Sequence, residues 1–566
     1  MENRTSTSGM TRRAMVGLCA AAGLATLAGC NNDNAGTSAG DAGTSGEGAS
    51  SEGGSKELTV FVVSSLATLD AQNDSNSDDN DITALLGEGL YRYDADGTTP
   101  VPGMAESYEV SDDGLTYTFT LKEGMKWQDG TDVTADQFVY SLQRFYDPAT
   151  ASENANSYLS YVEGAGAVYN GEIAPEELSA SAPDDLTFEV TMGAVLPQPT
   201  VLAFFAGPTC YPQRSDMIEQ GGDGWSTDPA THLSNGTYIL DTYAPDDRVV
   251  LVRNDAYTGD APAEADKITF MLYADTAASE VAMGNGELAF YRNASESLIA
   301  QMDGKATLQT CETLGTALLY MNNASEPFDD PKVREAVFRG IDATYARDTL
   351  ENGYAQVAEG IVGDVFSDPQ GGSFREAGEA VVPAFSDEEL QAAKDALAEA
   401  GYENGEGLPK LSFITTSTAV GTSRAEFFQA MLRDNLGVEV EVESFDIPAY
   451  LDRLVSGNFN LAYANVSVSC DNSIELLQQF TTEANNYGIA VPEFDELIEQ
   501  AMAEPDPATQ SELLHQAERV LIADNYAIRP VCYSYTNLIY ASDAEDVVIC
   551  PTGNCLFNYM KLASWA

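Results

Sequence analysis

Positive charge is scarce in this sequence. The 566 residues include 27 Lys and Arg against 89 Asp and Glu, which gives a formal net charge of −62 at pH 7. Such a surface repels the phosphates of nucleic acids and the headgroups of anionic lipids. A nucleic-acid partner is therefore excluded. The charge is compatible with a cationic ligand, but it indicates more simply a soluble, self-repelling surface.

Histidine is also rare, because His232 and His515 are the two in the chain. They are far apart, and neither lies in a motif with the spacing of a metal site or of a catalytic nucleophile. A Walker loop, a nucleophile elbow and a dinucleotide fingerprint are missing too. We therefore assign no catalytic residue, no metal and no cofactor, and we do not expect an enzyme.

The first thirty residues resemble an export signal. Two arginines at 12–13 precede an apolar stretch at 14–28 that is too short and too rich in Ala and Gly for a membrane span, and it ends in the lipobox-like LAGC of 27–30. This pattern predicts a lipoprotein signal peptide over 1–29 and a lipid on Cys30. A plain signal peptide with an incidental cysteine is the alternative. The twin arginines indicate export of a folded protein, with an ordinary basic signal start as the alternative.

A tether is expected next. Residues 31–55 are almost entirely Gly, Ser, Ala, Asn, Asp, Thr and Glu, so they cannot bury enough apolar surface to fold. We expect 30–56 to be the lipidated cysteine and a disordered tether. No later run of eighteen uncharged apolar residues follows, so the body is expected outside the membrane, on the periplasmic side or in the cell envelope, held by its lipid.

Local patterns in the first half predict a hairpin and a helix. Asp112-Asp113-Gly114 is a turn signal, and Tyr117, Phe119 and Leu121 alternate with threonines as in a half-buried strand. Thr134 and the glutamine three residues later form a capping box, after which apolar residues recur at helical spacing.

The second half alternates between helices and strands. Asp330-Pro331 begins one expected helix, and the capping box of Ser386 and Glu389 begins another. A strand at 411–415, a helix at 423–436 and a strand at 438–442 follow. The order predicts an α/β lobe. The sequence has no repeat of fixed period, which argues against a solenoid or a propeller.

Several segments in the right order carry a family resemblance. They read MAESY at 104–108, SDDGLTYTF at 111–119, KWQDG at 126–130, FVYSLQR at 138–144, LSNGTY at 233–238, YMNN at 320–323, PFDDPKVR at 327–334, NNYG at 485–488 and FD at 494–495. These segments resemble the peptide- and nickel-binding family of extracytoplasmic solute-binding proteins, family 5, and its oligopeptide-binding branch fits best. The resemblance covers residues 58 to about 540.

The resemblance implies an α/β fold of the two-lobed, periplasmic-binding-protein-like kind (type II, large peptide-binding cluster), with an extra subdomain in the N-terminal lobe. The expected divisions are an N-terminal lobe at 57–310 with its subdomain at about 92–220, a C-terminal lobe at 311–524, and a return to the N-terminal lobe at 525–566.

The function that the resemblance implies is capture of oligopeptides or dipeptides outside the membrane in a cleft between the lobes. The partners would be an ABC permease with cytoplasmic ATPases, and the protein is expected to be a monomer. The alternatives are the same fold binding a metal complex, an opine or a glycoside, and a lipid-anchored sensor or envelope hydrolase that uses the scaffold.

The resemblance also implies where a peptide would bind. One strand-pairing segment falls near Ser75, Asn76 and Ser77, for which a solvated loop is the alternative. In the other candidate segment, Arg292 or Asn293 would hold a peptide carbonyl or carboxylate, because a guanidinium suits a planar carboxylate. An exposed Arg292 without ligand contact is the alternative.

The clearest departure from the family lies at 459–471. Members often have a Trp and then Ala-Asp-Tyr here, and that Asp pairs with the α-amine of the peptide. An ungapped comparison places Val466 at the Trp and Ser469 at the Asp, with Asp471 two residues later. Either Asp471 takes over the amine or the clamp is lost. Either the pocket is wider here, or Tyr463 and Tyr450 replace the missing aromatic wall.

Six cysteines remain once Cys19 leaves with the signal and Cys30 carries lipid. Outside the cytoplasm, six cysteines permit fifteen full pairings. A Cys550–Cys555 bridge would close a local loop and a Cys311–Cys470 bridge would staple the second lobe, with free buried thiols as the alternative.

Overall fold

The structure is a computed structural model that describes residues 55–62, 66, 68–73, 77–152, 154–273, 275–468 and 470–565. The expected signal peptide, Cys30 and nearly all of the tether lie outside the described residues, as do Ser75, Asn76 and Ser469. No helix of the described part is both long enough and apolar enough to cross a bilayer.

One ten-stranded sheet runs through the molecule. Its strands, in spatial order, are β14 (Val440–Phe445), β13 (Leu411–Thr416), β15 (Leu461–Ser467), β12 (Ala306–Met321), β16 (Arg529–Ala541), β11 (Phe290–Arg292), β1 (Glu57–Val62), β10 (Lys267–Leu272), β9 (Arg248–Arg253) and β8 (Tyr238–Ala244). Pairing is parallel between β1 and β10 and between β13 and β14, and antiparallel between β12 and β16. The mixture of parallel strands with intervening helices is the predicted α/β architecture.

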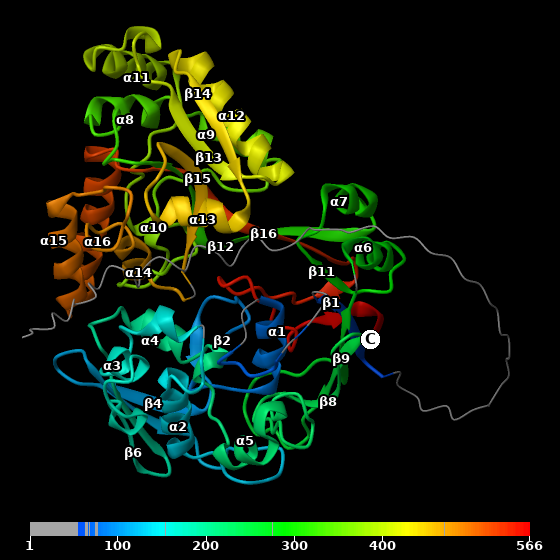
Figure 1. Ribbon diagram of the computed structural model, residues 1–566. Coiled ribbons are helices and arrows are strands. Elements are labelled where there is room, and N and C mark those ends of the chain that lie inside the picture. Colours follow the sequence, from blue (N-terminus) through cyan, green and yellow to red (C-terminus); the bar gives the residue numbers. More distant parts are fainter. Residues whose placement is uncertain are drawn as a thin grey trace, which may run out of the picture.

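The two long central strands join the two halves of this sheet. β16 pairs with β11 through Leu538–Tyr540, whereas β12 pairs with β15 through Gly315–Met321. Figure 1 shows β12 and β16 passing between an upper lobe and a lower lobe. A register shift between Glu312 and Thr316 interrupts their ladder at this crossing.

The lower lobe holds a second, four-stranded sheet of β4 (Ala105–Val110), β5 (Thr116–Leu121), β7 (Thr187–Thr191) and β6 (Ala180–Asp184). The other elements of this lobe are β2 (Tyr91–Tyr93), β3 (Pro100–Pro102), α1 (Ser77–Leu86), α2 (Ala135–Tyr146), α3 (Ala165–Tyr169), α4 (Gln198–Phe204), α5 (Ser215–Gly221), α6 (Thr276–Gly284) and α7 (Glu296–Met302). Helix α2 packs on β6 and β7. The helix covers one face of the small sheet and gives this part its own core.

The upper lobe is built from helices around the other end of the large sheet (Figure 1). They are α8 (Pro331–Arg339), α9 (Ala343–Leu350), α10 (Phe374–Ala377), α11 (Asp387–Glu399), α12 (Ala419–Leu436), α13 (Ile447–Val455), α14 (Ser473–Gln478), α15 (Pro492–Ala503) and α16 (Pro507–Arg519). The divisions at 57–310, 311–524 and 525–566 stay predictions.

The local patterns are confirmed. Tyr117, Phe119 and Leu121 are 3%, 0% and 2% exposed on β5, whose hairpin with β4 turns at 111–115. The capping box of Thr134 and Gln137 opens α2. Two elements begin at other residues than predicted. The strand expected at 438–442 is β14, Val440–Phe445. Helix α12 begins at Ala419 instead of 423, because the Thr418 hydroxyl accepts a hydrogen bond from the Gly421 amide at 3.1 Å and caps the helix there.

All six described cysteines are free thiols, and five of them are buried. Cys550 does not bond to Cys555, and Cys311 does not bond to Cys470. Cys311 packs against the core of the large sheet in the lower lobe, whereas Cys470 packs among the aromatic residues of the small sheet. The second lobe is therefore stabilised by packing and hydrogen bonds, without a disulfide staple.

Candidate functional site

A cavity of about 1830 Å³ opens between the two lobes. The lower lobe contributes residues from α1, from 203–211 and from the C-terminal loop 550–559, and the upper lobe contributes the starts of α12 and α13. The floor comes from the crossing strands, at 313–317 on β12 and 532–537 on β16. The site therefore needs both lobes and the strands that join them.

The lining is rich in hydroxyl and amide groups but poor in net charge. Among the described residues, six charged side chains line it, three of each sign, in a chain with a net charge of −62: Glu88, Arg92, Asp275, Arg292, Glu351 and Arg424. These groups bind one another or neighbouring groups of the protein. The cleft is thus close to neutral although the molecule is strongly acidic.

Two ion pairs illustrate this internal pairing. In the upper lobe, Arg424 Nη2 lies 2.7 Å from Glu351 Oε1, and the Tyr535 hydroxyl donates to the other carboxylate oxygen at 3.3 Å. In the lower lobe, Glu88 lies 3.7 Å from Arg92 and accepts a hydrogen bond from the Tyr257 hydroxyl at 2.6 Å. Burial raises the pKa of Glu88.

Arg292 lines the cleft but is bound within the lower lobe. It is 8% exposed and forms an ion pair with Asp81, which is 2% exposed, and it also donates to the Gly553 carbonyl. Asp81 in turn accepts from the Cys555 amide at 2.7 Å. The alternative of an exposed Arg292 was wrong, because this side chain is buried where it connects α1 to the C-terminal loop, and its contact with a ligand stays a prediction.

Asn293, the neighbour of Arg292, also lines the cleft. Its backbone has a φ of +53°, which asparagine tolerates better than most residues. Its amide donates to the Asn537 carbonyl at 2.8 Å, and its Oδ1 accepts from the Thr536 hydroxyl at 3.0 Å. Asn293 therefore joins the lower-lobe wall to the floor.

On the upper wall and the floor, four polar side-chain atoms are buried without a hydrogen-bond partner among the described residues. They are Tyr463 OH, Ser534 Oγ, Asn537 Oδ1 and Arg424 Nε. Buried polar atoms are normally paired, so unpaired ones gathered in one cleft point to contacts with a bound molecule. Tyr463 and Tyr450 both line the upper wall, where an aromatic replacement was expected.

Asp471 does not line the cleft. It is 6% exposed, and its Oδ1 accepts from the Ser367 amide at 2.9 Å, while burial raises the pKa of its carboxyl. Asp471 is therefore absent from the described part of the lining. Its contact with the amine of a ligand stays a prediction.

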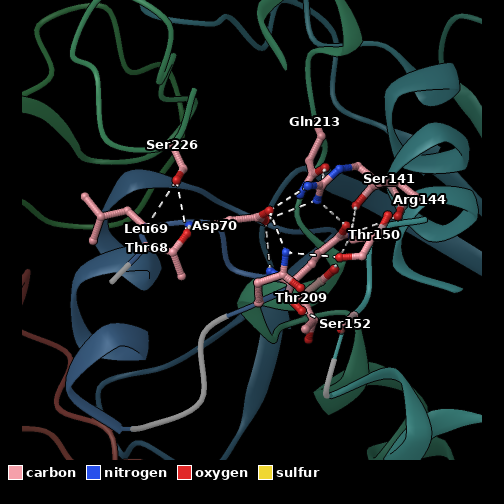
Figure 2. Close-up of polar contacts among 12 residues, drawn as sticks. Thr68, Leu69, Asp70, Ser141, Arg144, Thr150, Ser152, Thr209, Gln213 and Ser226 are labelled. Atoms are coloured by element: carbon pink, nitrogen blue, oxygen red, sulfur yellow. Dashed lines mark hydrogen bonds and ion pairs between the residues drawn. The ribbon is translucent and has the colours of Figure 1, made fainter. Parts of the chain in front are cut away.

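The expected strand-pairing segment lies next to a well-anchored stretch of the lower lobe (Figure 2). Arg144 donates to Asp70 Oδ2 at 2.6 Å, and the Ser226 hydroxyl lies 3.1 Å from that of Thr68. Ser77 is the first residue of α1, that helix lines the cleft through Asn80 and Ala84, and Gly87 lines it directly after the helix.

A second contact joins the lobes away from the crossing strands. The Thr200 hydroxyl of α4 donates to the Asp471 carbonyl at 2.7 Å, and Asn472 Nδ2 donates to the Tyr161 hydroxyl at 2.9 Å. That hydroxyl donates in turn to Glu475 Oε2 at 3.2 Å. Burial raises the pKa of Glu475 to about 8, and the hydrogen bond from the Tyr161 hydroxyl offsets only part of this effect.

Sequence patterns did not find Glu351, Arg424, Tyr535 or the Tyr161–Glu475 contact. The residues that pair here are 73, 184 and 314 positions apart. One signal was available for Arg424: it lies in the first turns of a helix that follows a strand of a parallel pair, where α/β proteins place their ligands.

This architecture, with two lobes, crossing strands and a large polar cleft between them, defines a two-lobed solute-binding protein. The model of the family described as "Bacterial extracellular solute-binding proteins, family 5 Middle" matches residues 99–488, more than half of the chain. The chain therefore belongs to family 5 of the bacterial extracellular solute-binding proteins, as predicted.

Individual relatives agree with this assignment. The chain is 28% identical over 454 residues to the dipeptide-binding protein DppE of Bacillus subtilis, covering 80% of this chain and 82% of that protein. It is 29% identical over 485 residues to the periplasmic oligopeptide-binding protein OppA of Salmonella typhimurium, covering 84% and 86%. The unliganded open form of the murein tripeptide-binding protein MppA matches with a TM-score of 0.77 at 24% identity, over 90% of this chain and 98% of that one. This last likeness confirms the two-lobed fold.

Proposed function

We propose that this protein captures oligopeptides or dipeptides outside the membrane in its interlobe cleft and delivers them to the permease of an ABC importer. The observation that carries the proposal is the cleft itself, with unpaired polar atoms on its upper wall and floor. The names of the two relatives, one dipeptide-binding and one oligopeptide-binding, support a peptide as the ligand.

The size of the cleft favours an extended ligand. Sites for small molecules typically measure about 300–1,000 Å³, and this cleft of about 1830 Å³ exceeds that range. A peptide offers backbone groups that pair with strand edges whatever its side chains are, which gives affinity without sequence preference. Hydroxyl and amide groups on the walls suit such pairing better than isolated charges do.

Closure of the lobes around the ligand would make capture a signal to the importer. A ligand that touches both walls binds the closed arrangement more tightly than the open one, and this difference in affinity shifts the protein toward closure. The permease would then recognise the two lobe surfaces in their closed register. Hydrolysis of ATP belongs to separate subunits, and we assign this chain no enzyme activity.

The location follows from the family and from the first thirty residues. The signal pattern ending at Cys30 supports a lipid anchor, and the polar segment after it supports a tether that lets the lobes reach the permease. A monomer suffices, since both walls of the cleft come from one chain. No observation favours the non-peptide ligands or the sensor and hydrolase functions.

A thermal-shift assay tests the proposal. The purified protein, unfolded and refolded to remove bound ligand, is heated with mixed peptides of two to eight residues. A ligand that binds only the native state stabilises it by about 2.7 kcal/mol at a hundredfold excess over its dissociation constant, so Tm should rise clearly. Free amino acids at the same concentration are the control. A Tm that no peptide raises would refute the proposed ligand class.

A further inference from the structure

The upper wall of the cleft presents apolar side chains to solvent. Large hydrophobic residues of the described part are exposed at seven positions: Val110, Val281, Leu308, Tyr345, Val420, Ile447 and Val455. Two of them, Val420 at 56% and Ile447 at 40%, line the cleft. Exposed apolar area is unfavourable in water, and exposed apolar side chains that line a binding cleft indicate a place that a ligand covers.

The fold holds these two side chains at one edge of the sheet. Strands β13 and β14 are parallel neighbours, with Thr416 opposite Phe445 at their carboxyl ends. Beyond that point the Ser417 amide still donates to the Phe445 carbonyl at 2.7 Å. Val420 is the second residue of α12 and Ile447 the first of α13, so both follow directly from this edge.

Capping fixes where the two helices begin. Thr418 caps α12, and the Asp446 side chain accepts from the Ala449 amide at 2.9 Å and caps α13. Val420 and Ile447 therefore lie in the first turns that these two caps begin. The positions of Val420 and Ile447 are therefore set before any ligand enters.

Helix α13 continues the apolar surface toward the floor. Leu451 and the nearly buried Leu454 line the cleft one turn and two turns after Ile447. The charged groups nearby are engaged elsewhere: Arg453 stacks on the Phe445 ring at 4.2 Å, and Arg424 is bound to Glu351. The patch has no charge of its own to attract an ionic side chain.

We propose that Val420, Ile447 and Leu451 form an apolar subsite that receives an aliphatic or aromatic side chain of the bound peptide. The inference rests on the proposed function and adds a preference to it. Backbone pairing accepts any sequence, whereas this subsite selects for an apolar residue at one position of the peptide. Closure of the lobes would then cover the side chain together with Val420 and Ile447.

Calorimetric titration with a positional series tests this subsite. The probes are alanine pentapeptides in which one position at a time carries leucine or aspartate. Burial of a leucine side chain is expected to raise the affinity about tenfold over alanine at one position, and aspartate there should bind more weakly than alanine. In the V420S/I447S double variant, the ratio of leucine-peptide to pentaalanine affinity should fall from about ten to about one.

The matched control is Val455→Ser, which removes an exposed apolar residue of the same helix that does not line the cleft. It should keep the full leucine gain. Equal weakening of all peptides by V420S/I447S would overturn the subsite and show that these residues pack on the opposite lobe instead. An absence of leucine preference at every position would also overturn it while leaving peptide binding intact. No binding of any peptide by the unaltered protein would refute the proposed function itself.

Discussion

Replacement of Arg292 by alanine is expected to lower the free energy of unfolding of the lower lobe by about 3–5 kcal/mol. The substitution removes the guanidinium that faces Asp81, and loss of one partner from a buried pair leaves the other charge poorly compensated. It also removes the donor to the Gly553 carbonyl. Urea unfolding followed by tryptophan fluorescence measures the change, since the three tryptophans of the chain, Trp127, Trp225 and Trp565, all lie in this lobe.

The functional consequence should accompany the loss of stability. Arg292 ties the C-terminal loop to α1, and residues 550–556 of that loop line the cleft. Peptide affinity should therefore fall as the wall loosens, even at temperatures where the variant is folded. The matched control is Arg253→Ala, whose ion pair with Asp266 is 39% and 45% exposed and should contribute less than about 1 kcal/mol. Equal effects of the two variants would contradict this account of Arg292.

Substitution of Glu475 by glutamine is expected to remove a pH dependence of stability. Burial raises the pKa of Glu475 to about 8 in the folded protein, so between its ordinary value near 4.5 and pH 8 the folded state holds a proton that the unfolded state has released. The free energy of unfolding therefore falls as pH rises through this window and levels off above pH 8. Glutamine keeps an acceptor for the Tyr161 hydroxyl and does not titrate.

The difference between variant and unaltered protein should be small at pH 4.5 and reach on the order of 3 kcal/mol in favour of the variant at pH 8, after allowance for partial solvent contact. Urea unfolding at half-unit steps of pH gives the two curves. Glu499→Gln, at an exposed carboxylate on α15, should leave the slope unchanged. Parallel curves for Glu475→Gln and the unaltered protein would show that this carboxyl is ionised at neutral pH.

Local features of the fold were predictable from the sequence because neighbouring residues determine them. The β5 alternation of Tyr117 and Phe119 and the capping box at Thr134 depend on residues within a few positions of one another. The start of α12 was misplaced because Thr418 follows two other threonines, and sequence alone did not show which of them caps the helix.

The site was only partly predictable, because its groups come together from distant parts of the chain. Tyr463 and Asn293 do line the cleft, but burial of Arg292 depends on Asp81, which lies 211 positions earlier. Asp471 was a reasonable candidate by its spacing, yet the Ser367 amide engages its carboxylate. Neither partner lies near its residue in the sequence, and only the packed lobes reveal them.

Hydrogen–deuterium exchange with and without a bound peptide tests the central claim most directly. The account predicts slower exchange on both walls and the floor together, at 290–293 and 550–556 in the lower lobe, at 447–454 in the upper lobe and at 533–537 on β16. Segments far from the cleft, such as 387–399 of α11, should exchange as before. Peptide binding with protection confined to one lobe, or located outside these segments, would contradict the assignment of the interlobe cleft as the peptide site.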